Sequence, residues 1–440
     1  MAALNMGVLP IPPEITERAL TLCHPRDVAS FSRTCRRART LVYNSPDQYL
    51  WRQLFLLYPF DHIRNSSHWQ YEYHAESHFD WAKELQRRIQ AELIALSTHP
   101  RNEDLMVALE TFVSVVRNAS PVTRGNERVR SPSLLWVVDV LEASDLLRSP
   151  FVIQELEDGN NQTLSRLRSY LALTLDDFDD EEEGRLRAHR LRTRSRCYVY
   201  DLQNYRRSND WGPFTETGEV DWVHAESIIN VILGNLGELV QWADTRPPCG
   251  LEATRASSAP GATSRPPGDW AGIEGTWRRY VCFMDYRALY SFNFRNRAHP
   301  SLFDDPQFRE ATRLIELKLH LIDVENVPSF YALDRFPESH NPKYPTLYFA
   351  GTSWGIHGNE ATVVGSVSMS DEGIVRWRFA SVSEKRINWS SEGAQIGGVA
   401  SAAGIIGTWT GPHHEREDPV GPFWLWKVAD DHPSYMEALM

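Results

Sequence analysis

Hydrophobic periodicity divides this chain at one place, and that division constrains the fold more than any other feature. Before residue 245, apolar residues recur mostly at the three- and four-residue spacing of amphipathic helices. Residues 245–268 are rich in Pro, Ala, Ser, Thr and Gly, which predicts a flexible linker and the main domain boundary. Beyond it, short β-branched and aromatic runs alternate with Gly, Asn, Asp and Pro, as in short strands. The sequence therefore predicts an α+β protein, helical first and β second.

The strand-like runs predict an antiparallel β-barrel or sandwich over residues 269–430. The clearest runs are Trp277–Met284, Leu314–Leu321, Thr346–Ala350, Thr362–Met369, Ile374–Phe379 and Ile405–Thr410. Gly275-Thr276-Trp277 resembles the beginning of lipocalin-like barrels, in which the Trp plugs one end. Most of the 15 Trp residues lie beyond residue 200, so this half is expected to carry the recognition surface.

Residues 61–244 predict a helical middle region. The expected helices are 79–97, 102–118, 131–148, 160–174 and 221–241. A charged interruption precedes the last of these helices: we expect the acidic run Asp176–Glu183 to be an exposed loop, and the six arginines within Arg185–Arg196 to neutralise it. The acidic run lacks the spacing of a calcium loop.

Residues 1–60 read as a three-helix unit in which short helices begin at prolines and acidic first turns. Their motifs resemble the F-box in order and register. The matching segments are Leu9-Pro10, Pro13-Glu14-Ile15 with Leu20 and Leu22, Asp27-Val28, Cys35–Arg39 and Leu50-Trp51-Arg52-Gln53-Leu54. The middle segment departs from the family pattern, because Thr34 and Ala38 replace the usual Val and Trp.

The resemblance implies that the chain docks on a Skp1-type subunit, and through it on a cullin, as a substrate adaptor of an SCF ubiquitin ligase. The residues expected to bind that subunit are Leu9, Pro10, Pro13, Ile15, Leu20, Leu22, Val28, Phe31, Leu50, Trp51 and Leu54. Two physical features agree with a partner. A segment of this size buries too little apolar area to be stable alone. It also carries seven arginines, no lysine and four acidic residues, whereas the resemblance implies an acidic Skp1-type partner.

The C-terminal part resembles the substrate-side barrel of cyclin-D1-binding F-box proteins, on Trp277–Arg287 and Ser391–Trp409. That resemblance implies a barrel that recruits protein degrons. It identifies no contact residue. The N-terminal helices have a simpler alternative reading as a cap on the adjoining helical region, with no partner.

Composition excludes several other classes. A net charge of −12 argues against a general nucleic-acid binder, because such a protein needs a basic face. Five scattered cysteines without a CxxC pair fit a reducing compartment and neither a disulfide framework nor a zinc site. There is no apolar run of membrane-spanning length and no basic segment before the apolar N-terminus, so a soluble cytoplasmic or nuclear protein without membrane contact is expected.

Two motifs offer catalytic or metal chemistry. Gly351-Thr352-Ser353-Trp354-Gly355 matches the nucleophile elbow of serine hydrolases, but the residues after it, up to Val364, read as turn and strand, so a glycine-rich hairpin is expected. His62, His68, His74 and His78 do not form the His-Glu-x-x-His pattern of a zinc helix, since His74 and His78 are four residues apart without that Glu, and we expect surface or capping histidines. We therefore expect no catalytic residue, cofactor or metal. The alternatives are a hydrolytic or small-ligand-binding barrel with a non-functional helical cap, and a structural scaffold.

Overall fold

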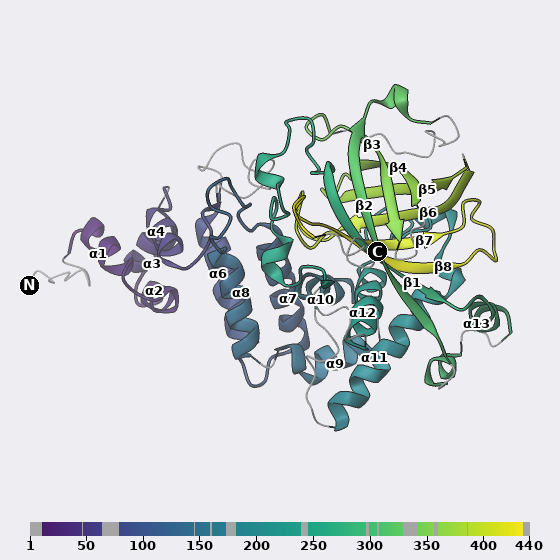
Figure 1. Ribbon diagram of the computed structural model, residues 1–440. Helices are drawn as coiled ribbons and strands as arrows, with labels where there is room; N and C mark the ends of the chain where they lie inside the picture. Colours follow the sequence, from purple (N-terminus) through teal and green to yellow (C-terminus); the bar gives the residue numbers. More distant parts are fainter. Residues whose placement is uncertain are drawn as a thin grey trace, which may run out of the picture. The chain divides into compact units, whose positions relative to one another are not determined.

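The chain divides into two compact units, of which the computed structural model describes most residues (Figure 1). The described residues are 11–45, 47–63, 79–144, 146–158, 161–172, 182–238, 245–295, 299–305, 308–328, 341–355, 360–384 and 386–433. The first unit comprises Met1–Ser120 and Arg130–Val152, and the second comprises Pro121–Val129 and Ile153–Met440. The predicted helical middle region, 61–244, is therefore not one domain, because the two units share its helices.

The first unit is helical. Its helices are α1 (Pro13–Leu20), α2 (Pro25–Ser32), α3 (Arg36–Tyr43), α4 (Tyr49–Leu57), α6 (Trp81–Ala95), α7 (Asn102–Arg117) and α8 (Pro132–Ala143). Proline begins α1, α2 and α8, where its missing N–H costs no helical hydrogen bond. The prediction of three helices in residues 1–60 is thus wrong, because the described part of this segment contains four, α1 to α4. The extra helix, α3, begins at the arginine-rich stretch, where the Cys35 Sγ accepts a hydrogen bond from the Ala38 N–H at 3.3 Å.

One core joins the first four helices to α6. Its fully buried members come from all five helices: Leu20, Val28, Val42, Leu50, Trp51, Leu54, Phe55, Trp81, Leu85 and Ile89. Helices α6, α7 and α8 correspond to the predicted 79–97, 102–118 and 131–148. The F-box-like segment is therefore not a separate 60-residue domain, because α6 supplies part of its core.

The second unit begins with helices that pack together. These are α10 (Gln162–Leu171), α11 (Glu182–Tyr200) and α12 (Trp222–Glu238); α9 (Pro150–Asp158) spans the boundary between the units. Helices α10 and α12 match the predicted 160–174 and 221–241. The arginine run was predicted as a charged interruption between helices, but it forms α11, and Arg196 pairs with Glu310 at 2.9 Å. Most of the acidic run before it lies outside the described residues.

Eight antiparallel strands form a closed barrel in which each pairs with the next and the last returns to the first. They are β1 (Gly275–Met284), β2 (Glu310–Ile322), β3 (Leu347–Gly355), β4 (Glu360–Met369), β5 (Val375–Ser383), β6 (Arg386–Gln395), β7 (Ile405–Thr410) and β8 (Val420–Lys427). The predicted antiparallel barrel is confirmed. Helix α12 packs against β7 and β8 on its outside (Figure 1).

Aromatic side chains fill one half of the barrel interior. Trp277 and Trp377 lie with ring centroids 5.2 Å apart, and Phe349 lies 5.5 Å from Trp377. The Trp277 indole N–H donates to the Ile273 carbonyl at 2.8 Å, which holds the ring at the end where β1 begins. Glycines make room for such rings: a Cβ on Gly365 would overlap Phe349.

The segment predicted as a flexible linker is packed against the barrel. Within residues 245–268, Ser257 N–H donates to the Val399 carbonyl at 2.8 Å and Ala259 N–H to the Ala400 carbonyl at 3.0 Å. Arg255 is buried and donates to the Val129 carbonyl at 2.7 Å. The linker prediction is therefore wrong. Small residues let this segment approach the barrel closely, and a composition rich in small residues is equally typical of a flexible linker.

None of the helices in the described ranges is both long and apolar enough to span a bilayer.

Candidate functional site

The residues predicted to bind a Skp1-type subunit fall into two groups. Leu20, Val28, Leu50, Trp51 and Leu54 are buried in the core of the first unit, and Phe31 is half-buried. Pro13, Ile15 and Leu22 are exposed, whereas Leu9 and Pro10 lie outside the described residues. The buried group holds the helices together, so the exposed group is the one that a partner can touch.

The exposed group is larger than the sequence predicted. Ile15 is 59% exposed and Leu22 is 81% exposed, although both are apolar. Ile11, Leu56 and Leu57 are also exposed and were not predicted as contacts. The signal for the last two is the run Leu54–Leu57, since four consecutive apolar residues cannot all face one side of a helix. We call Ile11, Pro13, Ile15, Leu22, Leu56 and Leu57 the apolar set.

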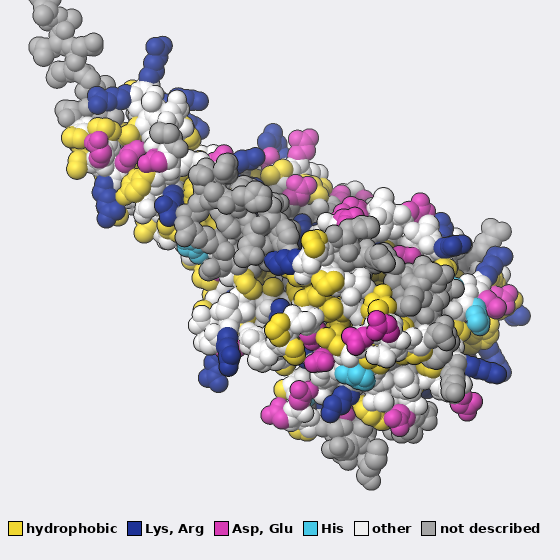
Figure 2. All heavy atoms as spheres, turned by 90° about the horizontal axis from the view of Figure 1, so that it is seen from above, with side chains coloured by type: hydrophobic (Ala, Val, Ile, Leu, Met, Phe, Trp, Pro, Cys, Tyr) yellow, Lys and Arg dark blue, Asp and Glu magenta, His cyan; other side chains and the backbone are white. Residues whose placement is uncertain are grey.

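Basic side chains accompany the apolar set. Six exposed arginines lie on or beside α1, α2 and α3: Arg18, Arg26, Arg33, Arg36, Arg37 and Arg39. Figure 2 shows blue and yellow side chains next to one another over this N-terminal part of the chain. A surface of this kind suits a partner that offers both apolar residues and carboxylates.

Trp51 fixes the arrangement of these short helices. Its indole N–H donates to the Val42 carbonyl at 2.7 Å, and its ring lies 5.6 Å from Tyr43. Arg88 of α6 is buried and packs over Phe55 at 5.1 Å, and Glu84 accepts from its Nε at 2.7 Å. Burial lowers the pKa of the Arg88 guanidinium. Helix α6 is thus part of the support for α4.

The Gly-x-Ser-x-Gly motif is not a nucleophile elbow. Ser353 lies within β3, which continues to Gly355, and β4 begins at Glu360. The Ser353 hydroxyl donates to the Ala361 carbonyl across the strand pair at 3.2 Å. An elbow needs a sharp turn into a helix, and neither is found in the described residues around Ser353. The expected hairpin is present as the antiparallel pair of β3 and β4, but Gly351–Gly355 belong to β3 and do not form its turn.

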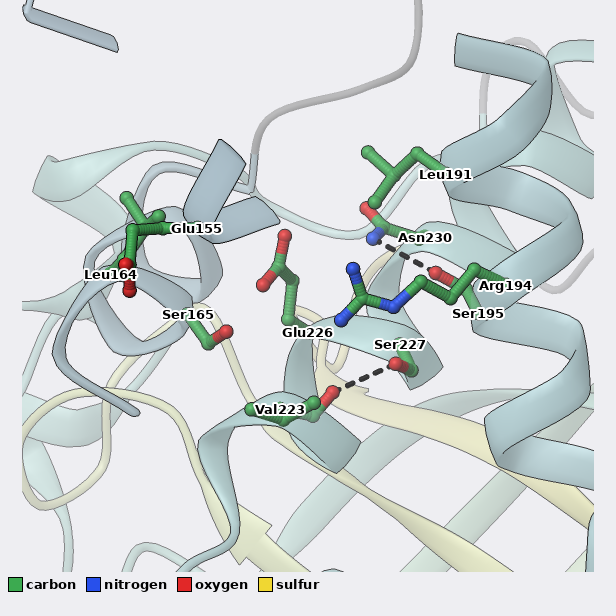
Figure 3. Close-up of a pocket in the computed structure, with 10 residues that line it drawn as sticks. All are labelled: Glu155, Leu164, Ser165, Leu191, Arg194, Ser195, Val223, Glu226, Ser227 and Asn230. Atoms are coloured by element: carbon green, nitrogen blue, oxygen red, sulfur yellow. Dashed lines mark hydrogen bonds between the residues drawn. The ribbon is translucent and has the colours of Figure 1, made fainter. Parts of the chain in front are cut away.

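A small polar cavity lies among the helices of the second unit. It has a volume of about 10 Å³ and is lined by Glu155, Leu164, Ser165, Leu191, Arg194, Ser195, Val223, Glu226, Ser227 and Asn230 (Figure 3). Beside it, Arg168 and Glu226 form a buried ion pair at 2.6 Å, and the Asn230 amide donates to Ser195 at 3.2 Å. This volume is about that of one water molecule, so the cavity suits a structural water and not a substrate.

Metal ligands do not converge in the described part of the chain, where no three His, Cys, Asp or Glu side chains are grouped as a metal site would need. Of the four predicted surface histidines, His62 is described and is half-buried. His68, His74 and His78 lie outside the described residues.

Comparison with known proteins adds no family to these observations: no family model, no curated protein and no solved structure matches the chain.

Proposed function

We propose that the chain is a substrate-recognition adaptor of an SCF-type ubiquitin ligase. The first unit docks on a Skp1-type subunit and through it on a cullin, and the barrel recruits protein substrates. The transfer chemistry then belongs to the assembled ligase, in the cytoplasm or nucleus. The observation that carries the proposal is the division of the F-box-like motif into residues that form a core and residues that stay exposed and apolar.

The apolar set accounts for the energy of docking. Burying an exposed aliphatic side chain stabilises a complex by roughly 1.5–3 kcal/mol. Leu22 and Leu57 are the most exposed of the large aliphatic side chains in the described part of the first unit. The surrounding arginines accelerate encounter with an acidic partner and fix its orientation.

The buried motif residues act indirectly. Leu50, Trp51 and Leu54 are at most 2% exposed, so a partner cannot reach them without unfolding α4. Their role is to hold α1 and α4 together and thereby present the apolar set. Deleting residues 1–60 is an unsuitable test, because the deletion would uncover Trp81 and Leu85 in α6.

The double substitution Ile15→Asp with Leu22→Asp tests the docking surface. Hot-spot residues of this kind cost roughly 2–4 kcal/mol each when lost, so the Kd for the Skp1-type subunit should rise by about 1,000-fold or more. The measurement is titration of purified Skp1-type subunit against the full chain, with circular dichroism to establish that both proteins stay folded.

The matched control is Val107→Asp. Val107 lies on α7 of the same unit and is 48% exposed, so the substitution adds the same charge away from the apolar set. Its Kd should equal that of the unsubstituted chain. Tight binding by a folded Ile15→Asp/Leu22→Asp variant would rule out docking through this surface.

A further inference from the structure

Arg279 is a buried cation inside the barrel. In β1 it lies between Trp277 and Val281, which belong to the barrel core, and its cross-strand partners are Ile315 on β2 and Leu425 on β8. Arg279 is 5% exposed. Because residues two apart in a strand share one face, its side chain points into the barrel.

Most hydrogen-bond capacity of this guanidinium is unused. A guanidinium has five N–H donors, and the Arg279 Nη2 donates to the Ser391 hydroxyl at 2.8 Å. The Arg279 Nε is buried without an acceptor, and no described carboxylate pairs with this side chain. The rings of Phe379 and Phe423 lie 4.8 and 4.4 Å from the guanidinium carbon. These rings offset only part of the cost of burying a charge.

The interior differs between the two ends of the barrel. The end at which β1 begins contains Trp277, Phe349 and Trp377, whereas at the opposite end, here called the mouth, strands β3 to β6 carry small side chains on their inner faces. These small inner residues are Ser353, Ala361, Ser381 and Ser391. Ile315 packs on the inner core yet is only half-buried, as are Ala361 and Ser381. Solvent therefore reaches inner positions at the mouth.

Three aromatic rings stand at the mouth beside these small residues. Trp409 lies 4.7 Å from Phe283 and 5.0 Å from Trp389, and Trp389 is 39% exposed. Trp409 is the cross-strand partner of Ser391, the residue that binds Arg279. A buried cation and a partly exposed aromatic group thus occur at adjacent positions.

We propose that the mouth of the barrel binds a small monocarboxylic acid, with its carboxylate paired to Arg279 and its apolar body against Phe283, Trp389 and Trp409. A guanidinium and a carboxylate form two parallel hydrogen bonds. The negative charge of the carboxylate neutralises the buried positive charge of Arg279.

Titration of the full chain with phenylacetate, benzoate and hexanoate tests this site. Tryptophan fluorescence should change saturably, because Trp389 and Trp409 lie beside the bound acid, and the thermal midpoint should rise with acid concentration. Phenylacetamide has the same shape without the charge and should not saturate. Arg279→Met should raise the Kd by about 10- to 100-fold. The exposed Arg287 provides the control, and Arg287→Met should bind as the unsubstituted chain does.

The inference is overturned if none of the three acids gives a saturable change, or if phenylacetamide binds as tightly as phenylacetate. The inference is also overturned if Arg279→Met binds the acids as tightly as the unsubstituted chain does. If Arg279→Met does not fold, Arg279→Lys keeps the charge without the planar fork and should weaken binding, and the amide comparison needs no variant. The acid titration measures binding to the barrel, whereas the titration with a Skp1-type subunit measures binding to the first unit. Failure of one proposal is therefore distinguishable from failure of the other.

Discussion

At the scale of single residues, burial ties the charge of His224 to the stability of the second unit. His224 is 1% exposed on α12 and faces the Tyr205 hydroxyl at 3.4 Å. Burial lowers its pKa to about 4, although Asp221 opposes the change. The neutral ring is therefore the form that the folded protein holds, whereas the unfolded chain takes up a proton near pH 6.5.

Acid should therefore destabilise the second unit. The stability that His224 contributes is present above pH 6.5 and is lost as the pH falls toward 4, because the unfolded state binds more protons in that window. The loss amounts to at most about 3 kcal/mol. His224→Gln should remove this part of the slope in urea unfolding measured from pH 7 to 4.

The exposed His413 offers the control for that measurement. His413→Gln makes the same substitution at an exposed position, so it separates the effect of removing a buried ring from the effect of the substitution itself. An unchanged slope in His224→Gln would show that other groups control acid unfolding.

The same scale explains what the sequence revealed of the proposed docking surface. Spacing identified Leu50, Trp51 and Leu54 as apolar residues on helical faces, but burial depends on which other helix covers the face. Helix α6 covers it, and the sequence does not indicate that Trp81 and Leu85 pack there. Ile15 and Leu22 have no such cover, and Leu57 was missed because it lies beyond the matched motif. Pattern thus locates the segment, whereas tertiary packing decides which side chains a partner can reach.

At the scale of elements, strongly patterned segments were predictable and polar ones were not. Six strands were anticipated, whereas β6 and β8 were missed. Strand β6 contains Asn388, Ser390 and Glu392, and β8 contains Gly421 and Pro422, residues that read as turns when their partners are unknown. Here the closed ring supplies what local propensity lacks, because each strand pairs on both edges.

The packed segment 245–268 leads to a prediction at this scale. Gly397 has φ +88°, and a Cβ there would overlap the backbone of Thr254. Gly397→Ala should separate the segment from the β6–β7 loop and speed tryptic cleavage after Arg255, which is buried in the native protein. Cleavage is monitored by mass spectrometry of timed digests.

Gly373→Ala is the matched control. Gly373 has φ +75° in the β4–β5 turn, and nothing lies within 4 Å of its added Cβ. Both alanines carry a left-handed strain of roughly 1–2 kcal/mol, but only Gly397→Ala adds an overlap with Thr254. Equal cleavage after Arg255 in both variants would show that this contact does not hold the segment.

At the scale of the whole molecule, the first unit and the barrel each have a core of their own, and each should respond separately to damage in its core. Leu54 belongs to the core of the first unit and Leu319 to the barrel core. Truncation of a buried leucine to alanine costs roughly 2–5 kcal/mol. Leu54→Ala should therefore raise hydrogen exchange in peptides of the first unit, and Leu319→Ala in peptides of the barrel.

Each of these variants is the other's control. A rise in exchange across both units in either variant would mean that they unfold as one cooperative body. The path of the chain explains why the linker prediction placed the boundary between the units wrongly. The chain leaves the first unit after Ser120, returns at Arg130 and leaves again after Val152, and no change in composition marks these crossings.

Closure of the barrel by its first and last strands sets an order for events on the ribosome. Strand β1 pairs with β8, so the ring cannot close until Val420–Lys427 has been synthesised. The first unit is complete in sequence by Val152, long before that point. A nascent chain halted between Gly275 and Val420 would carry β1 with an open edge, which is a template for association with other chains. We therefore expect this protein to need chaperones mainly late in translation, while the barrel is still open.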